Sequence, residues 1–273
     1  MNANSQPWRR NLRGFTLMEA IMVIVLTGIL AGMALVFIRS PITAYQDVTR
    51  RAELTDIADT ALRRIARDVR AALPNSVRIT PSACTGAALC FLEFVPIKSA
   101  GRYRENGPGD ALDFNAAADT FDVVGPGVDI AAGDAIVIYN LGITGVTGSD
   151  VYWGTTRRNA TTTGTGLTNV GYNGGAFPFA SPAHRFQIVG RPVSYVCNAP
   201  AGQLQRYSGY AYSSGQPQPP AGTPALLATN VSNCRFAYVA LSQLNALITL
   251  ELGVTRGGET VSLVHQIHVN NVP

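Results

Sequence analysis

The chain has 273 residues, of which 47% are hydrophobic and 14% charged, so it can bury a sizeable core and is too apolar to be disordered. Its net charge of +4 at first suggests a nucleic-acid partner. The first fourteen residues, however, carry three arginines and no acid, and the rest holds 18 basic against 17 acidic residues. The basic character belongs to this short leader, so we expect no nucleic-acid partner.

An apolar run, residues 15–38, follows the leader and contains one charged residue, Glu19. About 20 apolar residues in a helix cross a bilayer, so the run predicts one membrane-spanning helix in contact with lipid. A cleaved secretory signal would have a shorter apolar region ending in an A-x-A-like site. Arginines precede the run, so we expect a single-pass inner-membrane protein with a cytoplasmic amino terminus and residues 39–273 in the periplasm.

Glu19 is unusual, because a carboxylate in hydrocarbon costs several kcal/mol and requires a partner. If the chain is cut between Gly14 and Phe15, the new α-ammonium group of Phe15 lies four residues from Glu19. The two groups could then pair within one chain or between neighbouring chains. In the alternative interpretation, Glu19 lies near the membrane edge and its side chain reaches the interface.

The segment Arg13-Gly14-Phe15-Thr16-Leu17-Met18-Glu19 resembles the processing site of type IV prepilins and of type II secretion pseudopilins. The resemblance implies that a prepilin peptidase cuts after Gly14 and methylates Phe15, and that Glu19 drives assembly. It also implies major and minor pilins and an inner-membrane assembly platform as partners, and a final location in a pilus at the cell surface. The implied fold is α+β and type IV pilin-like, with a long amino-terminal helix packed on a carboxy-terminal antiparallel β-sheet domain.

The helix should continue beyond the membrane, because apolar residues recur every three or four positions from Leu54 to Leu73. The opposite face is charged, and we expect it to be exposed to solvent. Pro41 should kink this helix and Pro74 should end it near residue 72. Four segments follow: a leader (1–14), a transmembrane and assembly helix (15–38), its exposed amphipathic continuation (39–73) and a β-rich head (74–273).

Two pairs of residues on the charged face, Asp59 with Arg63 and Arg64 with Asp68, have the i,i+4 spacing of weak ion pairs. Beyond Pro74, β-branched and aromatic enrichment predicts strands at 89–95, 135–139, 186–196, 226–239 and 247–254. A turn at 256–259 should close a hairpin whose second strand ends near Val269.

Two stretches, 140–180 and 213–223, are rich in Gly, Thr or Pro and are predicted to be exposed loops. Tyr152, Trp153 and Tyr172 lie in the first stretch and could contact a sugar or a protein partner. Simple anchoring of the loop is the alternative, and we favour it.

The four cysteines are Cys84, Cys90, Cys197 and Cys234. An even number on an exported chain favours disulfides, and of three possible pairings we prefer the sequence-local one, Cys84–Cys90 and Cys197–Cys234. The chain-entropy model assigns these about 2 and about 4 kcal/mol. Four buried thiols are the alternative.

No motif predicts catalysis, and the chain is expected not to be an enzyme. The cysteines and histidines lack zinc-site spacing. Seven acids between residues 105 and 134 lack EF-hand spacing, so no metal or cofactor is assigned; they are Glu105, Asp110, Asp113, Asp119, Asp122, Asp129 and Asp134.

Three further stretches, 67–78, 193–197 and 265–273, resemble minor pilins of the MSHA system, which makes the mannose-sensitive haemagglutinin type IV pilus. This resemblance implies a low-abundance subunit that starts or caps the pilus. One alternative is a J-like minor pseudopilin of a type II secretion system. Another is a membrane-anchored adhesin or binding protein that uses the Gly/Thr-rich loops.

Overall fold

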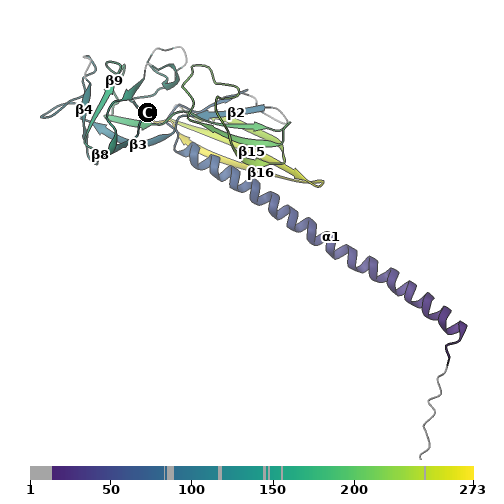
Figure 1. The fold of residues 1–273 in the computed structure, drawn as a ribbon. Coiled ribbons are helices and arrows are strands. Elements are labelled where there is room, and N and C mark those ends of the chain that lie inside the picture. Colours follow the sequence, from purple (N-terminus) through teal and green to yellow (C-terminus); the bar gives the residue numbers. More distant parts are fainter. Residues whose placement is uncertain are drawn as a thin grey trace, which may run out of the picture. The chain divides into compact units, whose positions relative to one another are not determined.

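The computed structural model describes residues 14–82, 84, 89–115, 119–143, 146, 148–154, 156–242 and 244–273, without the side chains of residues 38–43. The leader up to Arg13 therefore lies outside the described set. Residue 41 is helical in its backbone, and the kink expected there stays a prediction. The chain divides into two compact units, Met1–Arg50 and Arg51–Pro273. One helix, α1 (Leu17–Arg70), contributes to both units (Figure 1).

The second unit is built mainly of short strands joined by turns. In chain order these elements are β1 (Arg78–Thr80), β2 (Leu89–Phe94), β3 (Ile97–Tyr103), β4 (Thr120–Val124), β5 (Val128–Ile130), β6 (Ala135–Val137), the 3₁₀ helix η1 (Val151–Trp153), β7 (Arg157–Ala160), β8 (Gly164–Leu167), β9 (Asn169–Asn173), β10 (Arg185–Val189), β11 (Val193–Asn198), β12 (Gln203–Ser208), β13 (Ala225–Thr229), β14 (Val231–Ala240), β15 (Asn245–Arg256) and β16 (Glu259–Asn270).

The last part of α1 packs against two antiparallel sheets, one in the order β1-β2-β11-β12-β13 and the other β14-β15-β16. The predicted apolar stripe from Leu54 to Leu73 is buried, apart from the half-buried Ile57, and Leu62 and Ala66 extend it. Apart from Leu73, these side chains share one core with residues of both sheets, including Tyr195 and Leu250. The α+β, type IV pilin-like fold expected from the sequence is therefore confirmed.

A second core lies inside a closed barrel of six strands in the order β10-β3-β4-β9-β7-β6. Aromatic rings fill it: the centroids of Phe121 and Phe186 are 5.0 Å apart, as are those of Tyr172 and Phe177. The prediction that residues 140–180 form only exposed loops was wrong, because β7, β8 and β9 lie there. These strands are short and contain Gly, Asn or Thr, so strand pairing and not a local apolar pattern stabilises them: β7 and β9 lie in the barrel, and β8 pairs with β5.

The barrel is an insertion into the head sheet. Phe94, at the end of β2, lies directly opposite Val193, at the start of β11, and the barrel strands fall between them in the chain. The single strand predicted at 186–196 is thus two strands, β10 in the barrel and β11 in the head sheet. Pro192 separates them, because proline cannot donate to a strand ladder. The strand predicted at 226–239 is likewise divided, at Asn230, whose φ is 58°.

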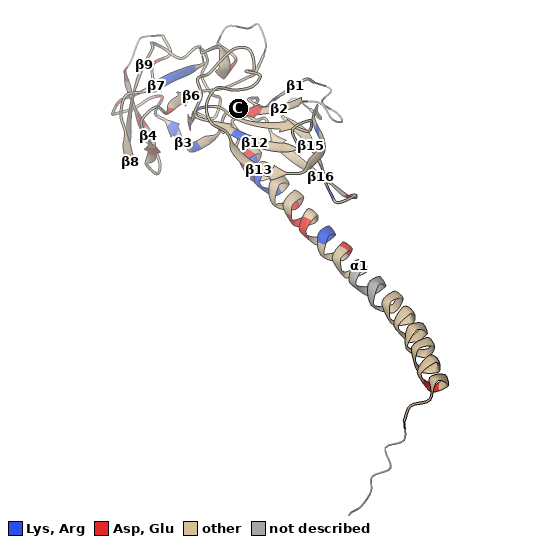
Figure 2. Ribbon diagram, turned by 45° about the vertical axis from the view of Figure 1, so that its right-hand side comes forward, with Lys and Arg blue, Asp and Glu red and all other residues tan. Residues whose placement is uncertain are grey.

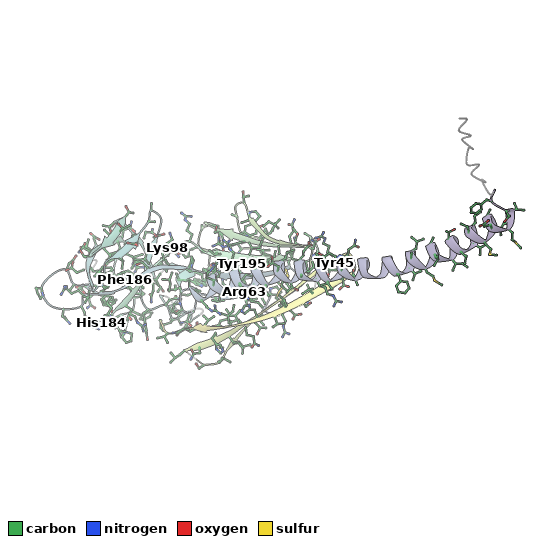
Figure 3. All side chains as sticks on the ribbon, turned by 90° about the horizontal axis from the view of Figure 1, so that it is seen from below. Tyr45, Arg63, Lys98, His184, Phe186 and Tyr195 are labelled. Carbon is green, nitrogen blue, oxygen red and sulfur yellow. A yellow bond between two sulfur atoms is a disulfide. The ribbon has the colours of Figure 1, made fainter. Side chains whose placement is uncertain are left out.

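Asp68, near the end of α1, bonds to the head sheet and not to its predicted partner Arg64. The pair of Asp59 and Arg63 is present at 2.6 Å. The pair of Arg64 and Asp68 is not found among the described residues, because Asp68 Oδ2 instead accepts hydrogen bonds from the Tyr195 hydroxyl at 2.7 Å and from Arg206 Nε at 3.2 Å. Figure 3 labels Tyr195 beside the helix.

The carboxy-terminal hairpin forms as predicted, with Arg256 opposite Glu259. Gly257 and Gly258 both have positive φ, 59° and 84°, which a two-residue hairpin turn requires. Two ion pairs join this hairpin end to α1: Arg51 with Glu259 at 2.9 Å and Glu53 with Arg256 at 3.1 Å.

The stretch 213–223 is irregular, as predicted. Arg78 on β1 fixes its first residues, because its guanidinium donates to the carbonyl oxygens of Ser213 and Ser214 at 2.9 and 2.8 Å. The same guanidinium pairs with the fully buried carboxylate of Glu93 at 2.5 Å. The Arg78 guanidinium, held by Glu93, therefore ties this loop to the head sheet.

Candidate assembly site at the amino-terminal helix

The predicted cleavage site lies immediately before the helix. Gly14 and Phe15 have no regular structure, and α1 begins at Leu17. The Thr16 hydroxyl oxygen accepts from the Glu19 N–H at 3.3 Å, and the Thr16 carbonyl oxygen accepts from the Ala20 N–H at 3.1 Å. Thr16 is thus the helix N-cap, with Glu19 in the third helical position. This Thr-x-x-Glu arrangement matches the start of a capping box, a signal that the sequence analysis missed.

Leu17–Phe37 is long and apolar enough to cross a membrane, and none of it is buried in the protein. Phe15, Leu17 and Phe37 are 73%, 82% and 81% exposed. A continuous apolar surface of this kind requires lipid or another protein to cover it. Figure 2 shows the contrast along α1, with charged residues gathered in its later part and a single acid near its start.

Within Leu17–Phe37 only Glu19 and Thr27 have polar side chains. The Thr27 hydroxyl donates to its own helix, to the carbonyl oxygens of Val23 at 2.5 Å and Ile24 at 3.1 Å, so it needs no other partner. The Glu19 carboxylate has no hydrogen bond or ion pair with any residue that the structure describes. The partial positive charge of the helix amino terminus favours it at this position but cannot replace a hydrogen-bond donor. Glu19 is therefore the polar side chain of this run that still needs a hydrogen-bond donor from outside the described part of the chain.

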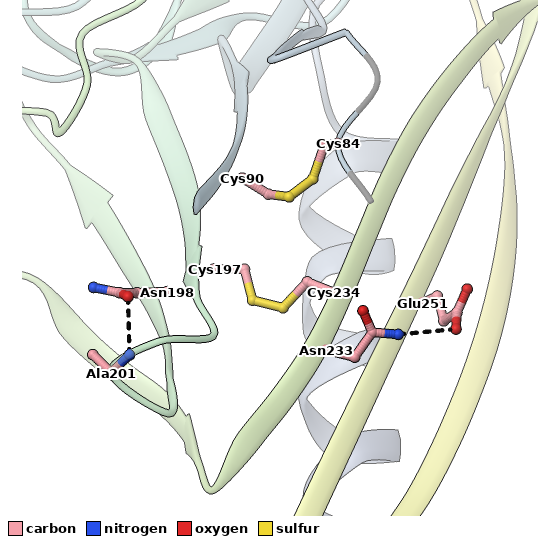
Figure 4. The surroundings of a disulfide bond; sticks show 8 residues. All are labelled: Cys84, Cys90, Cys197, Asn198, Ala201, Asn233, Cys234 and Glu251. Carbon is pink, nitrogen blue, oxygen red and sulfur yellow. Dashed lines mark hydrogen bonds between the residues drawn. A yellow bond between two sulfur atoms is a disulfide. The ribbon is translucent and has the colours of Figure 1, made fainter. Parts of the chain in front are cut away.

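Two disulfides lie in the head, Cys84–Cys90 and Cys197–Cys234, with Cα–Cα distances of 5.6 and 6.4 Å (Figure 4). These are the pairs preferred from the sequence, and the alternative of four free thiols is not what the structure shows. All four cysteines are buried. Cys197 belongs to β11 and Cys234 to β14, so the second bond joins the two sheets that enclose the helix.

The loop aromatics are mostly occupied in packing. The Tyr152 hydroxyl donates to the Ser76 carbonyl oxygen at 2.8 Å, and the Arg78 guanidinium lies 3.6 Å from the ring centroid. Tyr172 is 1% exposed inside the barrel core. Only Trp153, at 58%, is available to solvent among these three. Two of the three aromatics that could have contacted a sugar are therefore structural anchors.

Most of the acids between residues 105 and 134 are held by protein groups. Asn169 Nδ2 bridges the carboxylates of Asp110 and Asp122 at 3.2 and 3.0 Å. Lys98 pairs with the buried Asp134 at 2.5 Å. No group of three or more potential metal ligands occurs within the part of the chain that the structure describes.

Residues 9–35 match the family model described as the prokaryotic N-terminal methylation motif. The chain carries a type IV prepilin-like motif. The match spans the junction of Gly14 and Phe15, the acid Glu19 and most of the apolar helix. The motif implies processing by a prepilin peptidase and assembly with other pilins. No curated protein and no solved structure matches the chain.

Proposed function

We propose that this type IV pilin-like chain is a minor pilin equivalent to the O-type subunit of the MSHA system. Prepilin peptidase cuts it after Gly14 and methylates Phe15. Its apolar helix first holds it in the inner membrane, with the head in the periplasm, and later packs among the helices of a pilus. The observation that supports this most is the exposed apolar helix with Glu19 in its first turn, the one polar side chain of Leu17–Phe37 that has no partner among the residues the structure describes.

The inserted barrel supports a role in starting or capping the pilus. The connection between β2 and β11 could be a short turn, because Phe94 and Val193 lie opposite each other. Instead it holds a complete second core. A subunit repeated along a fibre must fit between its neighbours, whereas a terminal subunit has space for this bulk. The role proposed here is structural and not catalytic.

A minor pseudopilin of a type II secretion system would undergo the same processing and use the same helix. The resemblance of residues 265–273 to MSHA minor pilins favours the pilus. Co-purification with sheared pili, against co-purification with secretion pseudopilins, distinguishes the two. An adhesin function finds less support, since Tyr152 and Tyr172 are buried.

Processing is tested by amino-terminal mass spectrometry of the protein from cells with and without prepilin peptidase. With the peptidase, the amino terminus should be N-methylated Phe15. Without it, residues 1–14 should remain, because no other feature of the leader predicts a cleavage site. An amino terminus at Phe15 in the peptidase-deficient strain would refute the proposal.

Assembly is tested with Glu19→Ala, and Thr27→Ala serves as the matched control. Both substitutions remove a polar group from the same apolar run. Glu19→Ala should leave membrane insertion intact and lower the amount of the subunit in sheared pili at least tenfold, because it removes the group that needs an external partner. Thr27→Ala should have little effect, since its hydroxyl bonds only its own helix. Equal incorporation of both variants would exclude Glu19 from the mechanism.

A further inference from the structure

The last strand, β16, forms a long free edge of the head. It pairs with β15 along all twelve of its residues, Glu259–Asn270, with no register shift. Among the described residues no other strand pairs with it, so it ends the order β14-β15-β16 (Figure 1). One side of its backbone is therefore unpaired.

The register identifies which residues face this open side. Asn271 N–H donates to the Leu244 carbonyl oxygen at 2.8 Å. In an antiparallel ladder such hydrogen-bonded positions alternate with positions whose backbone groups point away from the partner. Counting back along the uninterrupted register, six residues direct their N–H and C=O groups outward: Thr260, Ser262, Val264, Gln266, His268 and Asn270.

Other edges of the two head sheets are protected in ways that β16 is not. β1 has three residues, and β13 has five with a register shift against β12. β14 carries a register shift, and the backbone of Cys84 forms an isolated antiparallel β-bridge with Phe236 of this strand. β16 has no bulge, proline, lysine or arginine. Proteins usually protect free edges with such features, because an unprotected edge accepts further strands.

The side chains of β16 would also gain from a neighbouring strand. Val261 and Leu263 are only partly buried against the core. On the opposite face Val264 is 62% exposed. The one acid, Glu259, lies at the end of the strand and already pairs with Arg51. An added strand would cover apolar groups on both faces without burying an unpaired carboxylate.

We propose that β16 is a docking edge, to which an extended, uncharged segment of a different subunit of the same fibre adds as a fourth strand. Only an extended backbone offers donors and acceptors at the spacing of the six outward residues. A second copy of this chain could offer only β16 itself, since its other edges are short, bulged or bridged. That pairing is a closed two-fold dimer, in which both β16 edges are used and neither can contact the next subunit of the fibre, so the partner is a different subunit.

The first test compares Gln266→Pro with Gln266→Ala in the full-length protein. The Gln266 N–H points outward, so proline there removes one docking hydrogen bond and leaves the ladder with β15 intact. Both variants should unfold within a few degrees of the wild type in detergent. Gln266→Pro should be recovered from sheared pili at less than a tenth of the wild-type amount, and Gln266→Ala at the wild-type amount.

Val264→Lys is the second variant, in case Gln266→Pro does not fold. A lysine on the exposed edge should block docking, whereas Val124→Lys places the same charge on the barrel at a valine of 47% exposure. Reduced incorporation of Val264→Lys, together with wild-type incorporation of Val124→Lys, supports the proposal. Wild-type incorporation of Val264→Lys, or of a folded Gln266→Pro, overturns it.

The partner is identified by placing a photo-crosslinking residue at Ser262. An adduct with an uncharged strand of another pilin-like subunit supports docking, whereas an adduct only between two copies of this chain overturns it. The inference rests on the proposed function, but the two can fail separately. If Glu19→Ala assembles normally, the assembly mechanism fails. If Glu19→Ala is absent from pili and the β16 variants assemble normally, only the proposal of a docking edge fails.

Discussion

Several tyrosine hydroxyl groups are buried in the head, and their ionisation should make stability depend on pH. Burial raises the pKa of Tyr195 and Tyr210 well above the ordinary value of 10.0, and neighbouring carboxylates act in the same direction. Burial likewise raises the pKa of Tyr212. Each group stays protonated in the folded state at a pH where the unfolded chain has lost its proton.

The free energy of unfolding should therefore be independent of these groups below about pH 10 and should fall as the pH rises above it. Urea denaturation in detergent between pH 8 and 11 measures this fall. Tyr195→Phe should make it shallower and, at neutral pH, cost about 1 kcal/mol, because Asp68 loses a hydrogen bond. Tyr45→Phe, at a position 74% exposed, is the control and should change neither quantity. A fall of equal slope in Tyr195→Phe would contradict this account.

At the scale of elements, the two disulfides differ in what they connect. Cys84–Cys90 closes a short loop with a sequence separation of 6, whereas Cys197–Cys234 has a separation of 37 and joins β11 to β14. Cys90 and Cys197 also lie opposite each other on neighbouring strands. The four cysteines are thus gathered at the place where the two sheets meet beside the helix.

Replacing both members of a pair by serine should lower the free energy of unfolding by about 4 kcal/mol for Cys197 and Cys234, and by about 2 kcal/mol for Cys84 and Cys90. The longer loop restricts the unfolded chain more. Urea denaturation of the two double variants in detergent gives both values, and each variant is the other's control for the added serines. The reverse order would show that loop entropy does not decide their contributions.

At the scale of the whole molecule, the inserted barrel has its own core and is connected through the adjacent ends of β2 and β11. Replacing residues 96–191 by a four-residue turn should therefore leave a folded head with its helix. Some stability should be lost, because Leu73 and Val95 also pack against barrel residues. If the barrel caps the fibre, the shortened subunit should still be processed, and pilus number or length should change.

Circular dichroism and thermal unfolding in detergent test the first part, and electron microscopy of pili tests the second. Gly209→Ala, outside the barrel, is a control for mild strain in the head. Its added methyl group would meet no atom within 4 Å, but the residue has a φ of 79°. An aggregated or unfolded deletion variant would show that the barrel is part of one folding unit with the head.

The sequence alone determines the features of the amino-terminal part of the chain, because their signals are local. A long apolar run, the acid within it and the residues before it are adjacent in the chain. The stripe from Leu54 to Leu73 repeats with the period of one helix, and the final hairpin has an alternating pattern with two glycines in its turn. Each of these features is visible in a window of a few turns or strands.

Tertiary structure decided what depends on residues far apart in the chain. The strands between residues 157 and 173 have no apolar pattern of their own. Pairing around the barrel makes strands of β7 and β9, and pairing with β5 makes a strand of β8. Asp68 was predicted to pair with Arg64, one turn away, but bonds Tyr195 and Arg206 from the head sheet. The sequence by itself determined the anchor, the motif and Glu19. The barrel, the partners of Asp68 and the free edge of β16 follow only from long-range strand pairing, which no local pattern encodes.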